Sequence, residues 1–256
     1  MSDQPVTPID RTGDPVIGVP PGPRTARDWA RLRMTDEILR VARDQLATVG
    51  AAGLSLRAIA RDLGVASSAI YRYFPSRDDL LTALIVEAYN GMGATAEMAE
   101  ARVPRADVSG RWAATCHAVR DWALAHPQQY ALIYGTPVPG YRAPVDTVGP
   151  ATRVSTLVTV ILVDAMAAGR LAPHVINEPL DADVVDAMAP LLSQLPTPMP
   201  PTVLVRGVQV LAALFGAVSW ELFGQFHNVI DETPEARRAF FGSLVRQWGV
   251  AVGLPE

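Results

Sequence analysis

Lysine is absent from this chain and cysteine occurs once. All 22 basic residues are arginine, a bias that reflects the composition of the coding DNA more directly than it reflects function. Cys116 is the single cysteine, so an internal disulfide and a cysteine-based zinc site are both excluded. This cysteine usage fits a reducing compartment, and we expect a cytoplasmic protein.

A membrane span and a secretion signal are also missing. The most apolar helical stretch, Gly207 to Trp220, is 14 residues long and is bracketed by Arg206 and Glu221. A transmembrane helix needs about 20 apolar residues, so this length predicts a buried helix and no membrane partner. The first 23 residues hold six prolines and three glycines without an apolar stretch, so we expect no signal peptide.

Catalytic and metal-binding patterns are equally scarce. The four histidines are scattered and form no HExxH pair, and the chain has neither a GxSxG nucleophile turn nor a phosphate-binding loop. His117 follows Cys116 directly, but neighbouring residues on a helix point in different directions, which argues against a catalytic dyad. We therefore predict that the chain is not an enzyme and holds no cofactor and no metal ion.

Charge is distributed unevenly along the chain. The net charge of −4 excludes a nucleic-acid binder that is basic over its whole length. Residues 24–77, however, contain ten arginines against five acidic residues, a net charge of +5, and the remainder carries −9. Such asymmetry indicates that only the N-terminal part contacts nucleic acid.

Prolines, glycines and helix caps divide the N-terminal part into segments. Residues 1–23 are predicted to be a disordered tail, because their prolines prevent regular hydrogen bonding. Residues 24–34 carry four arginines and form either a basic arm or the first turns of a helix. Thr35 is the predicted N-cap of a helix that ends at Gly50, with two acidic residues in its first turn.

Three further helices have clear start signals. Ser55 caps a short helix that ends at Gly64, and a third helix begins within residues 66–67 and reaches Phe74. Ser76 caps a fourth helix, which runs to about residue 101. The later helices are predicted at 109–125, 127–134, 151–170, 181–194, 201–227 and 234–250.

One segment is compatible with two structures. Residues 154–163, VSTLVTVILV, are rich in β-branched side chains and fit either a strand or a buried helix. Their position inside a longer run of helical length favours the helix. No segment shows the alternating pattern of a strand bounded by hairpin turns, so the predicted fold class is all-α.

Residues 54–74 form a helix, a glycine turn and a second helix, which is the sequence form of a helix-turn-helix. Leu56 and Ile59 brace the second helix, and the small Ala60 allows the two helices to approach closely. Gly64 permits the sharp turn between them. In this motif the N-terminal residues of the second helix face the major groove of DNA.

Residues 35–81 resemble the DNA-binding domain of the TetR family of transcriptional repressors. The matching stretch is GAAGLSLRAIARDLGVASSAIYRYFPSRDDLL, which holds the Ile-Ala pair, Leu-Gly-Val and the Tyr-Phe end of the recognition helix. Arg77 stands where the family usually has lysine, and Ala66 stands where serine is common. The resemblance implies a three-helix helix-turn-helix domain in residues 24–78, joined by the fourth helix to a larger helical ligand-binding and dimerisation domain in residues 79–256.

Ten polar residues are the predicted contacts with a double-stranded DNA operator. Serine and tyrosine hydroxyls reach base edges or phosphates, and the arginines neutralise phosphates or enter a groove. The alternatives are helix capping for the serines, packing for the tyrosines and a solvated charge for the arginines. The predicted contacts are Arg31, Arg33, Ser55, Arg57, Ser67, Ser68, Tyr71, Arg72, Tyr73 and Arg77.

The C-terminal part carries a second resemblance. Residues 211–226, LAALFGAVSWELFGQF, are similar to the dimer-forming helix of a TetR subgroup with a Trp/His-Gly motif, with Phe215-Gly216 in place of His-Gly. The resemblance implies a homodimer and a small-molecule effector, although each candidate residue also fits a plain core. The candidate ligand contacts are Trp112, Trp122, Tyr130, Tyr134, Met166 and Phe215. The candidate dimer contacts are Leu211, Leu214, Val218, Leu222, Phe240, Leu244 and Trp248.

The predicted function is that of a TetR-type regulator, a ligand-responsive repressor that binds a palindromic operator as a homodimer. Two alternatives stay open. The first is a ligand-independent DNA-binding protein, which a C-terminal domain without a cavity would favour. The second is an all-α enzyme with an incidental helix-turn-helix, which a catalytic constellation would favour.

Overall fold

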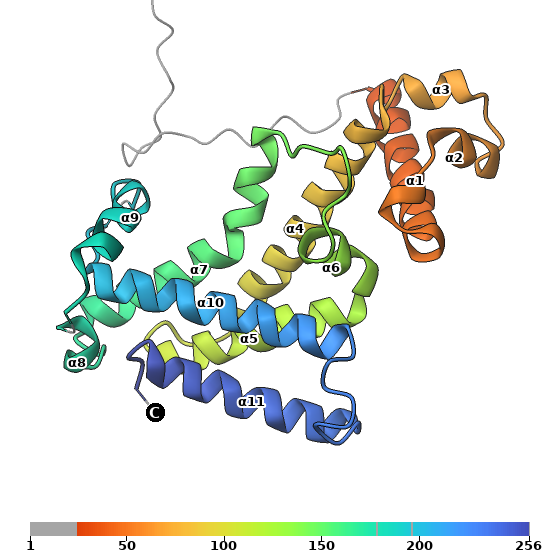
Figure 1. Ribbon diagram of the computed structural model, residues 1–256. Helices are drawn as coiled ribbons and strands as arrows, with labels where there is room; N and C mark the ends of the chain where they lie inside the picture. Colours follow the sequence, from red (N-terminus) through yellow and green to blue (C-terminus); the bar gives the residue numbers. More distant parts are fainter. Residues whose placement is uncertain (1–24, 178, 196, 256) are drawn as a thin grey trace, which may run out of the picture.

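The computed structural model describes residues 25–177, 179–195 and 197–255. The predicted disordered tail, residues 1–23, lies outside the described residues. Within those ranges the chain contains helices and no strand, so the all-α prediction is confirmed (Figure 1). In chain order the helices are α1 (Ala26–Val49), α2 (Leu56–Asp62), α3 (Ser67–Tyr71), α4 (Arg77–Glu100), α5 (Val108–Ala125), α6 (Pro127–Tyr134), α7 (Val148–Ala167), α8 (Pro173–Ile176), α9 (Ala182–Leu192), α10 (Pro201–Leu222) and α11 (Pro234–Ala251).

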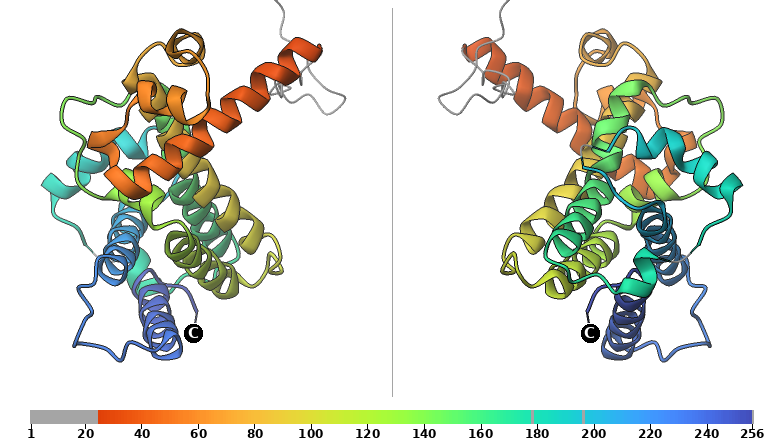
Figure 2. Two further views of the ribbon diagram at one scale, coloured as in Figure 1. Left: turned by 90° about the vertical axis from the view of Figure 1, so that its right-hand side faces the viewer. Right: turned by 90° about the vertical axis from the view of Figure 1, so that its left-hand side faces the viewer.

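The first helix begins nearly three turns before the predicted start. Thr25 caps α1 in a capping box with Asp28, so the prediction of an N-cap at Thr35 is wrong. Thr35 lies inside the helix and its hydroxyl donates to the carbonyl oxygen of Arg31. The segment 25–34 therefore forms helical turns, and these project away from the body (Figure 2).

The helix-turn-helix forms where its local signals predict it. Ser55 caps α2 and accepts a hydrogen bond from the amide of Ala58. Gly64 has φ +66°, a left-handed conformation that favours glycine. The amide of Val65 then donates to the carbonyl of Ala60 and closes the turn. The following helix α3 has only five residues and ends at Tyr71, before the predicted end at Phe74.

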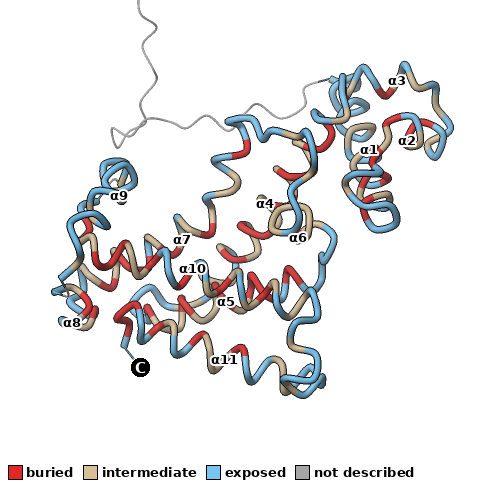
Figure 3. Tube along the Cα trace, in the orientation of Figure 1, coloured by how far each residue is buried: buried red, intermediate tan, exposed pale blue. Residues whose placement is uncertain are grey.

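Two clusters of buried residues divide the molecule (Figure 3). The first core joins α1, α2 and α3 to the first half of α4, where Leu80, Leu81 and Leu84 are almost fully buried. The second core joins the second half of α4, from Ala88 to Ala96, to the helices that follow it. Because α4 contributes to both cores, it fixes the position of α3 relative to the C-terminal body.

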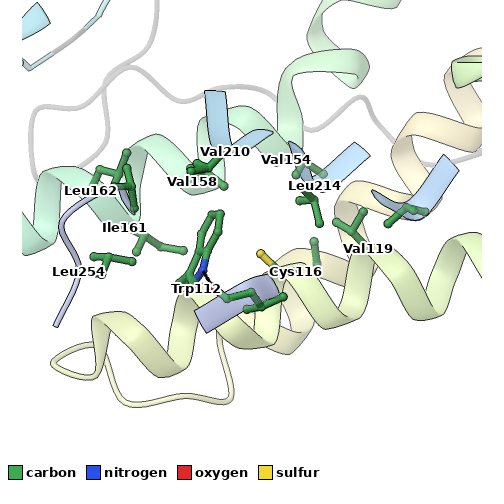
Figure 4. Packing of buried hydrophobic residues seen from close by; sticks show 14 of the residues in the cluster. Trp112, Cys116, Val119, Val154, Val158, Ile161, Leu162, Val210, Leu214 and Leu254 are labelled. Atoms are coloured by element: carbon green, nitrogen blue, oxygen red, sulfur yellow. Dashed lines mark hydrogen bonds between the residues drawn. The ribbon is translucent and has the colours of Figure 1, made fainter. Parts of the chain in front are cut away.

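The C-terminal body is built around α5. Trp112 and Cys116 point from α5 toward buried side chains of α7 and α10 (Figure 4). Those partners are Val158, Ile161, Val210 and Leu214. Two segments, Val145–Ala167 and α10, are long and apolar enough to cross a membrane by length and composition. Each of them contributes buried side chains to the second core.

Helix ends in the body differ from the predictions in a few places. The ambiguous segment 154–163 lies within α7, so the choice of a helix is confirmed. The short helix α8 was not predicted, because four residues carry no periodic signal. Helix α10 ends at Leu222 instead of residue 227, and Gly224 follows it with φ +77°. The glycine allows the left-handed turn that stops a helix.

Buried ion pairs connect the helices of the body. Arg111 of α5 is almost fully buried and donates to Glu100 of α4 at 2.5 Å and to Asp164 of α7 at 2.7 Å. Arg120 of α5 makes two hydrogen bonds, of 2.5 and 2.7 Å, to the carboxylate of Glu221 on α10. These pairs fix the helices at defined positions, because a buried charge without its partner is strongly unfavourable.

Candidate nucleic-acid interface and effector site

Helix α3 lies at the end of the molecule farthest from α11 (Figure 1). Ile70 is fully buried and Phe74 nearly so, and these two side chains fix the helix on the first core. Ser68, Tyr71 and Arg72 are exposed on the outer side. Polar side chains are therefore presented outward on a helix whose apolar side is anchored.

The first turn of α3 has no side-chain cap. Ala66 occupies the N-cap position and supplies no hydroxyl, in contrast to Ser55 at the start of α2. Ser67 follows it and is half-buried. The amide groups at the start of an uncapped helix remain donors for an anion such as a phosphate.

Four of the predicted DNA contacts also have structural partners. Ser55 caps α2, and its own amide donates to the side chain of Gln45 at 3.3 Å. The guanidinium of Arg31 lies 5.7 Å from the ring centre of the half-buried Tyr73, a cation–π contact that connects α1 to the end of α3. Arg77 donates to the carbonyl of Ala51 at 2.7 Å, in the 3₁₀ turn Ala51–Gly53. Each of these residues therefore has a role in holding the domain together.

The exposed arginines of this domain differ in their pairing. Arg40 is paired with Glu37 and Asp44, and the hydrogen bond from its guanidinium lowers the pKa of the Glu37 carboxyl. Arg33, Arg57 and Arg72 are exposed and have no acidic partner among the described residues. These three positive charges are free to meet phosphates.

The candidate ligand contacts do not form one site. Tyr130, Tyr134 and Phe215 converge with Tyr89 in an aromatic cluster where α6 meets α4 and α10. The rings of Tyr134 and Phe215 stack with centres 4.4 Å apart. The hydroxyl of Tyr130 donates to the carbonyl of Phe215 at 2.9 Å, and burial raises its pKa to about 12. Burial also raises the pKa of Tyr134, so both phenols are neutral at physiological pH.

The other three candidates lie apart from this cluster. Trp112 is buried and its indole nitrogen donates to the carbonyl of Val245 at 2.9 Å, which makes it part of the second core. Met166 packs against the same core from α7. Trp122 lines a cavity of about 480 Å³ between α1 and the body, beside Arg43 and Glu87. Sequence patterns alone could not assign the six candidates to the aromatic cluster, the second core or the cavity, because all six residues lie on apolar helical faces.

Contacts between the two cores were not predicted. Arg43 of α1 and Glu87 of α4 form an ion pair of 2.5 Å across 44 residues of sequence. The hydroxyls of Thr82 and Tyr141 are 2.9 Å apart and join α4 to the loop after α6. Leu132 of α6 packs against the first core. No local sequence signal indicates such pairs, because the partners are far apart in the chain.

The candidate dimer contacts need a correction. Leu214 and Val218 have no exposed surface and lie inside the core of their own subunit, so they are not available to a partner. Leu211, Leu222, Leu244 and Trp248 are half-buried against that core, and Phe240 is exposed. The exposed side of α10 instead carries an uncharged stripe, which we call the α10 stripe. It consists of Val208, Ala212, Gly216 and Trp220.

The four-residue spacing of the α10 stripe places its members on one side of the helix. Trp220 is 56% exposed and contacts Phe226 edge to face at 5.8 Å between ring centres, and Val208 is 43% exposed. A Cβ atom added at Gly216 would meet nothing within 4 Å. The only charged residues of α10, Arg206 and Glu221, are engaged with Ala251 and Arg120 of the same chain. The stripe is therefore apolar and free of charge.

Comparison with known proteins gives two family matches. Residues 38–84 match the model of bacterial regulatory proteins of the tetR family, and residues 112–247 match a tetracyclin repressor-like C-terminal domain. The second match includes residues 211–226. Together the two matches cover the helix-turn-helix and most of the C-terminal body.

The relatives that this chain resembles are also transcriptional regulators or share their fold. The chain is 41% identical over 204 residues to the HTH-type transcriptional regulators Rv1816 of Mycobacterium tuberculosis and Mb1846 of Mycobacterium bovis, covering 77% of this chain and 84% of theirs. The crystal structure of the regulatory protein SCO4313 superposes with a TM-score of 0.69 at 35% identity, over 88% of this chain and 98% of that one. A tetR family regulator from Shewanella sp. PV-4 shares the fold, with a TM-score of 0.54 at 17% identity over 83% of this chain and 96% of its own.

Proposed function

We propose a function that follows from the family of this chain, which belongs to the TetR family of DNA-binding transcriptional regulators. In this proposal the protein is a cytoplasmic repressor that binds a palindromic operator as a homodimer. It releases the operator when a small molecule binds. The observation that carries the proposal is the outer side of α3, where Ser68, Tyr71 and Arg72 are exposed over a buried Ile70. This is the arrangement that a helix entering a major groove requires.

The proposed DNA contacts fall into two groups. Ser67, Ser68 and Tyr71 face the groove, where hydroxyls reach base edges or phosphates. Arg33, Arg57 and Arg72 meet phosphates, because their charges have no acidic partner among the described residues. The remaining candidates, Arg31, Ser55, Tyr73 and Arg77, use part of their bonding capacity to hold the domain and meet phosphates with the rest. Neutralising several phosphates makes the affinity fall steeply as salt rises.

The proposed dimer forms through the α10 stripe together with the exposed Phe240 near the start of α11. An uncharged helix face with a glycine at its centre can pack closely on its own symmetry mate. A two-fold axis through this seam presents two copies of α3 to successive major grooves, about 34 Å apart along the DNA. The half-sites of the operator are then inverted repeats.

The proposed effector site includes the aromatic cluster of Tyr89, Tyr130, Tyr134 and Phe215. This cluster lies between α4, α6 and α10, and the first two of these helices also contact the first core. A ligand that binds there and favours one position of α6 acts on α4 and therefore on the spacing of the two recognition helices. The size of its effect is limited by its difference in affinity for the two positions.

The test is genome-wide footprinting of the purified full chain, followed by titration of an identified site. Arg57→Ala and Tyr71→Ala are each expected to weaken operator binding by about 1–3 kcal/mol, or roughly 5- to 150-fold. Arg102→Ala is the matched control. Arg102 is an exposed arginine that follows the C-terminal end of α4, the end that lies away from α3. Equal affinities for all four proteins would contradict the assigned contacts.

A small-molecule panel added to the same titration separates the repressor from its alternative. Release of the operator by one compound supports ligand control, and substitution of Phe215 should then abolish the release without changing operator affinity. A protein that holds its operator in the presence of every compound, with dimerisation intact, is a ligand-independent DNA-binding protein. Conversion of any compound to a product would point instead to an enzyme.

A further inference from the structure

A second cleft of the C-terminal body is lined by none of the residues of the aromatic cluster. It has a volume of about 570 Å³ and runs between the first turns of α5, the last turns of α11 and the residues that follow α11. We call it the α5–α11 cleft. Its walls include Trp112, Ala113, Val250, Leu254 and Pro255. A cleft of this size and apolar character is typical of sites for small organic ligands.

The apolar walls of the α5–α11 cleft are firmly held. The indole nitrogen of Trp112 donates to the carbonyl of Val245, and the hydroxyl of Ser109 donates to the carbonyl of Pro255 at 2.6 Å. Gly249 allows α11 to approach α5, because an added Cβ there would meet the indole ring of Trp112 at 3.3 Å. The polar groups of Trp112 and Ser109 are therefore satisfied within the protein, and the wall carries one further polar side chain, Gln247, whose amide nitrogen donates to the hydroxyl of Ser243 at 3.4 Å.

One charge lies on the edge of the α5–α11 cleft. Arg246 is the only charged residue that lines it, and it has no ion pair or hydrogen bond among the described residues. Its guanidinium extends along α11 toward Gly242, where an added Cβ would be 3.7 Å from Nη1 of Arg246 and 3.8 Å from Cε1 of His117. Arg246 therefore lies beside His117, which is not itself among the residues that line the cleft.

The neighbouring charges do not compensate Arg246. Arg238 of α11 is paired with Asp121 at 3.3 Å, and the two oxygens of Glu221 are occupied by Arg120. His117 packs its ring against Phe241, and its Nδ1 is buried without a hydrogen-bond partner among the described residues. Arg246 is therefore an uncompensated positive charge on the cleft wall, and it lies next to the imidazole of His117.

We propose that the α5–α11 cleft binds an amphipathic carboxylate, with an unbranched apolar chain along Trp112, Ala113 and Leu254 and the carboxylate on Arg246. The charge complementarity is direct, since a guanidinium and a carboxylate form two parallel hydrogen bonds. Arg246 is the one charge that lines the cleft, and the other polar side chains there, Ser109 and Gln247, are uncharged, so the ligand has one charged end. This site is separate from the aromatic cluster, and its occupancy does not depend on whether the chain binds DNA.

The test uses dodecanoate and its uncharged counterpart dodecanol, each titrated calorimetrically into the full chain below the concentration at which micelles form. Arg246→Gln is expected to weaken dodecanoate binding by at least about tenfold, because a hydrogen bond to a charged group is lost, and to leave dodecanol binding unchanged. Ala113→Leu fills the cleft and should weaken both. Arg142→Gln is the matched control, an exposed arginine in the loop after α6.

His117 provides a readout of where the carboxylate lies. Burial lowers the pKa of His117, with further lowering by Arg238, Arg120 and Arg246 against an opposing effect of Asp121. A carboxylate bound to Arg246 would offset the lowering of the His117 pKa that Arg246 causes. Dodecanoate should therefore raise the pKa of His117 in an NMR titration, and dodecanol should not.

Three outcomes would overturn the site. One is the absence of dodecanoate binding to the chain. Another is dodecanoate binding that Arg246→Gln and Arg142→Gln leave equally strong. A third is binding that appears only at dilutions where the chain is monomeric, which would show that a second copy of the chain covers the cleft.

Discussion

The buried Arg111 gives the sharpest prediction about stability. Its side chain is 2% exposed and donates to Glu100 at 2.5 Å, to Asp164 at 2.7 Å and to the carbonyl of Arg105 at 3.2 Å. Arg111→Met keeps most of the length of the side chain but removes the charge that pairs with the carboxylates of Glu100 and Asp164. These two side chains are only 15% and 19% exposed. Breaking a buried pair in this way costs about 3–5 kcal/mol. Asp164 retains its contact with Arg105, so we expect the lower end, about 3 kcal/mol.

For a chain of this length 1 kcal/mol corresponds to a change in Tm of about 2–4 °C, so Arg111→Met should lower Tm by roughly 6–12 °C. Calorimetry and circular dichroism melts measure this directly. Arg105→Met is the control, because that side chain is 74% exposed and its ion pair should contribute less than about 1 kcal/mol. Replacing Glu100 and Asp164 by leucine together with Arg111→Met should recover much of the loss. Equal Tm values for Arg111→Met and Arg105→Met would refute the reasoning.

Three further predictions concern the dimer, pH and the turn. If the proposed dimer forms through the α10 stripe, Trp220→Glu should give a monomer in analytical ultracentrifugation without loss of helical content. Val229→Glu, at a 72% exposed site off the stripe, should leave the proposed dimer intact. Folding lowers the pKa of His117 below its usual value of 6.5, so at a pH just below 6.5 the unfolded state binds more protons than the folded state. The free energy of unfolding should therefore fall as the pH drops through 6.5. In urea titrations at several pH values, His117→Gln should make this fall smaller. Gly64→Ala forces φ +66° on a residue with a Cβ and should cost about 1–2 kcal/mol in the same titrations, with weaker DNA binding at temperatures near Tm.

The helix-turn-helix was predictable because its signals are local. Ser55 and Ser76 cap their helices through their own side chains, and Gly64 takes the left-handed conformation at the turn. The start of α1 was predicted at the wrong threonine because two local cap signals compete there. Thr25 and Thr35 are both followed by acidic residues, and the competing cap at Thr25 forms because Asp28 completes a capping box there.

The exposed apolar side of α10 was less predictable because this helix is apolar on two sides. Periodicity identifies an apolar face but does not say whether that face meets its own subunit or another one. Leu214 lies on the inner side and Trp220 on the outer side of the same helix, and only the packing of α5 and α7 distinguishes them. Ion pairs such as Arg43 with Glu87 have no sequence signature at all, since each residue alone looks like an exposed charge.

The placement of α4 in both cores has a consequence for how the protein unfolds. Its 24 residues extend for about 36 Å, and no loop or hinge within the helix separates Leu84 of the first core from Ala88 of the second. Melting either core frays the helix on which the other core is assembled. Thermal denaturation should therefore appear as one cooperative transition, in which the calorimetric and van't Hoff enthalpies agree. A compound that binds tightly in the C-terminal body then protects the recognition helix from heat as well, although it touches no residue near it.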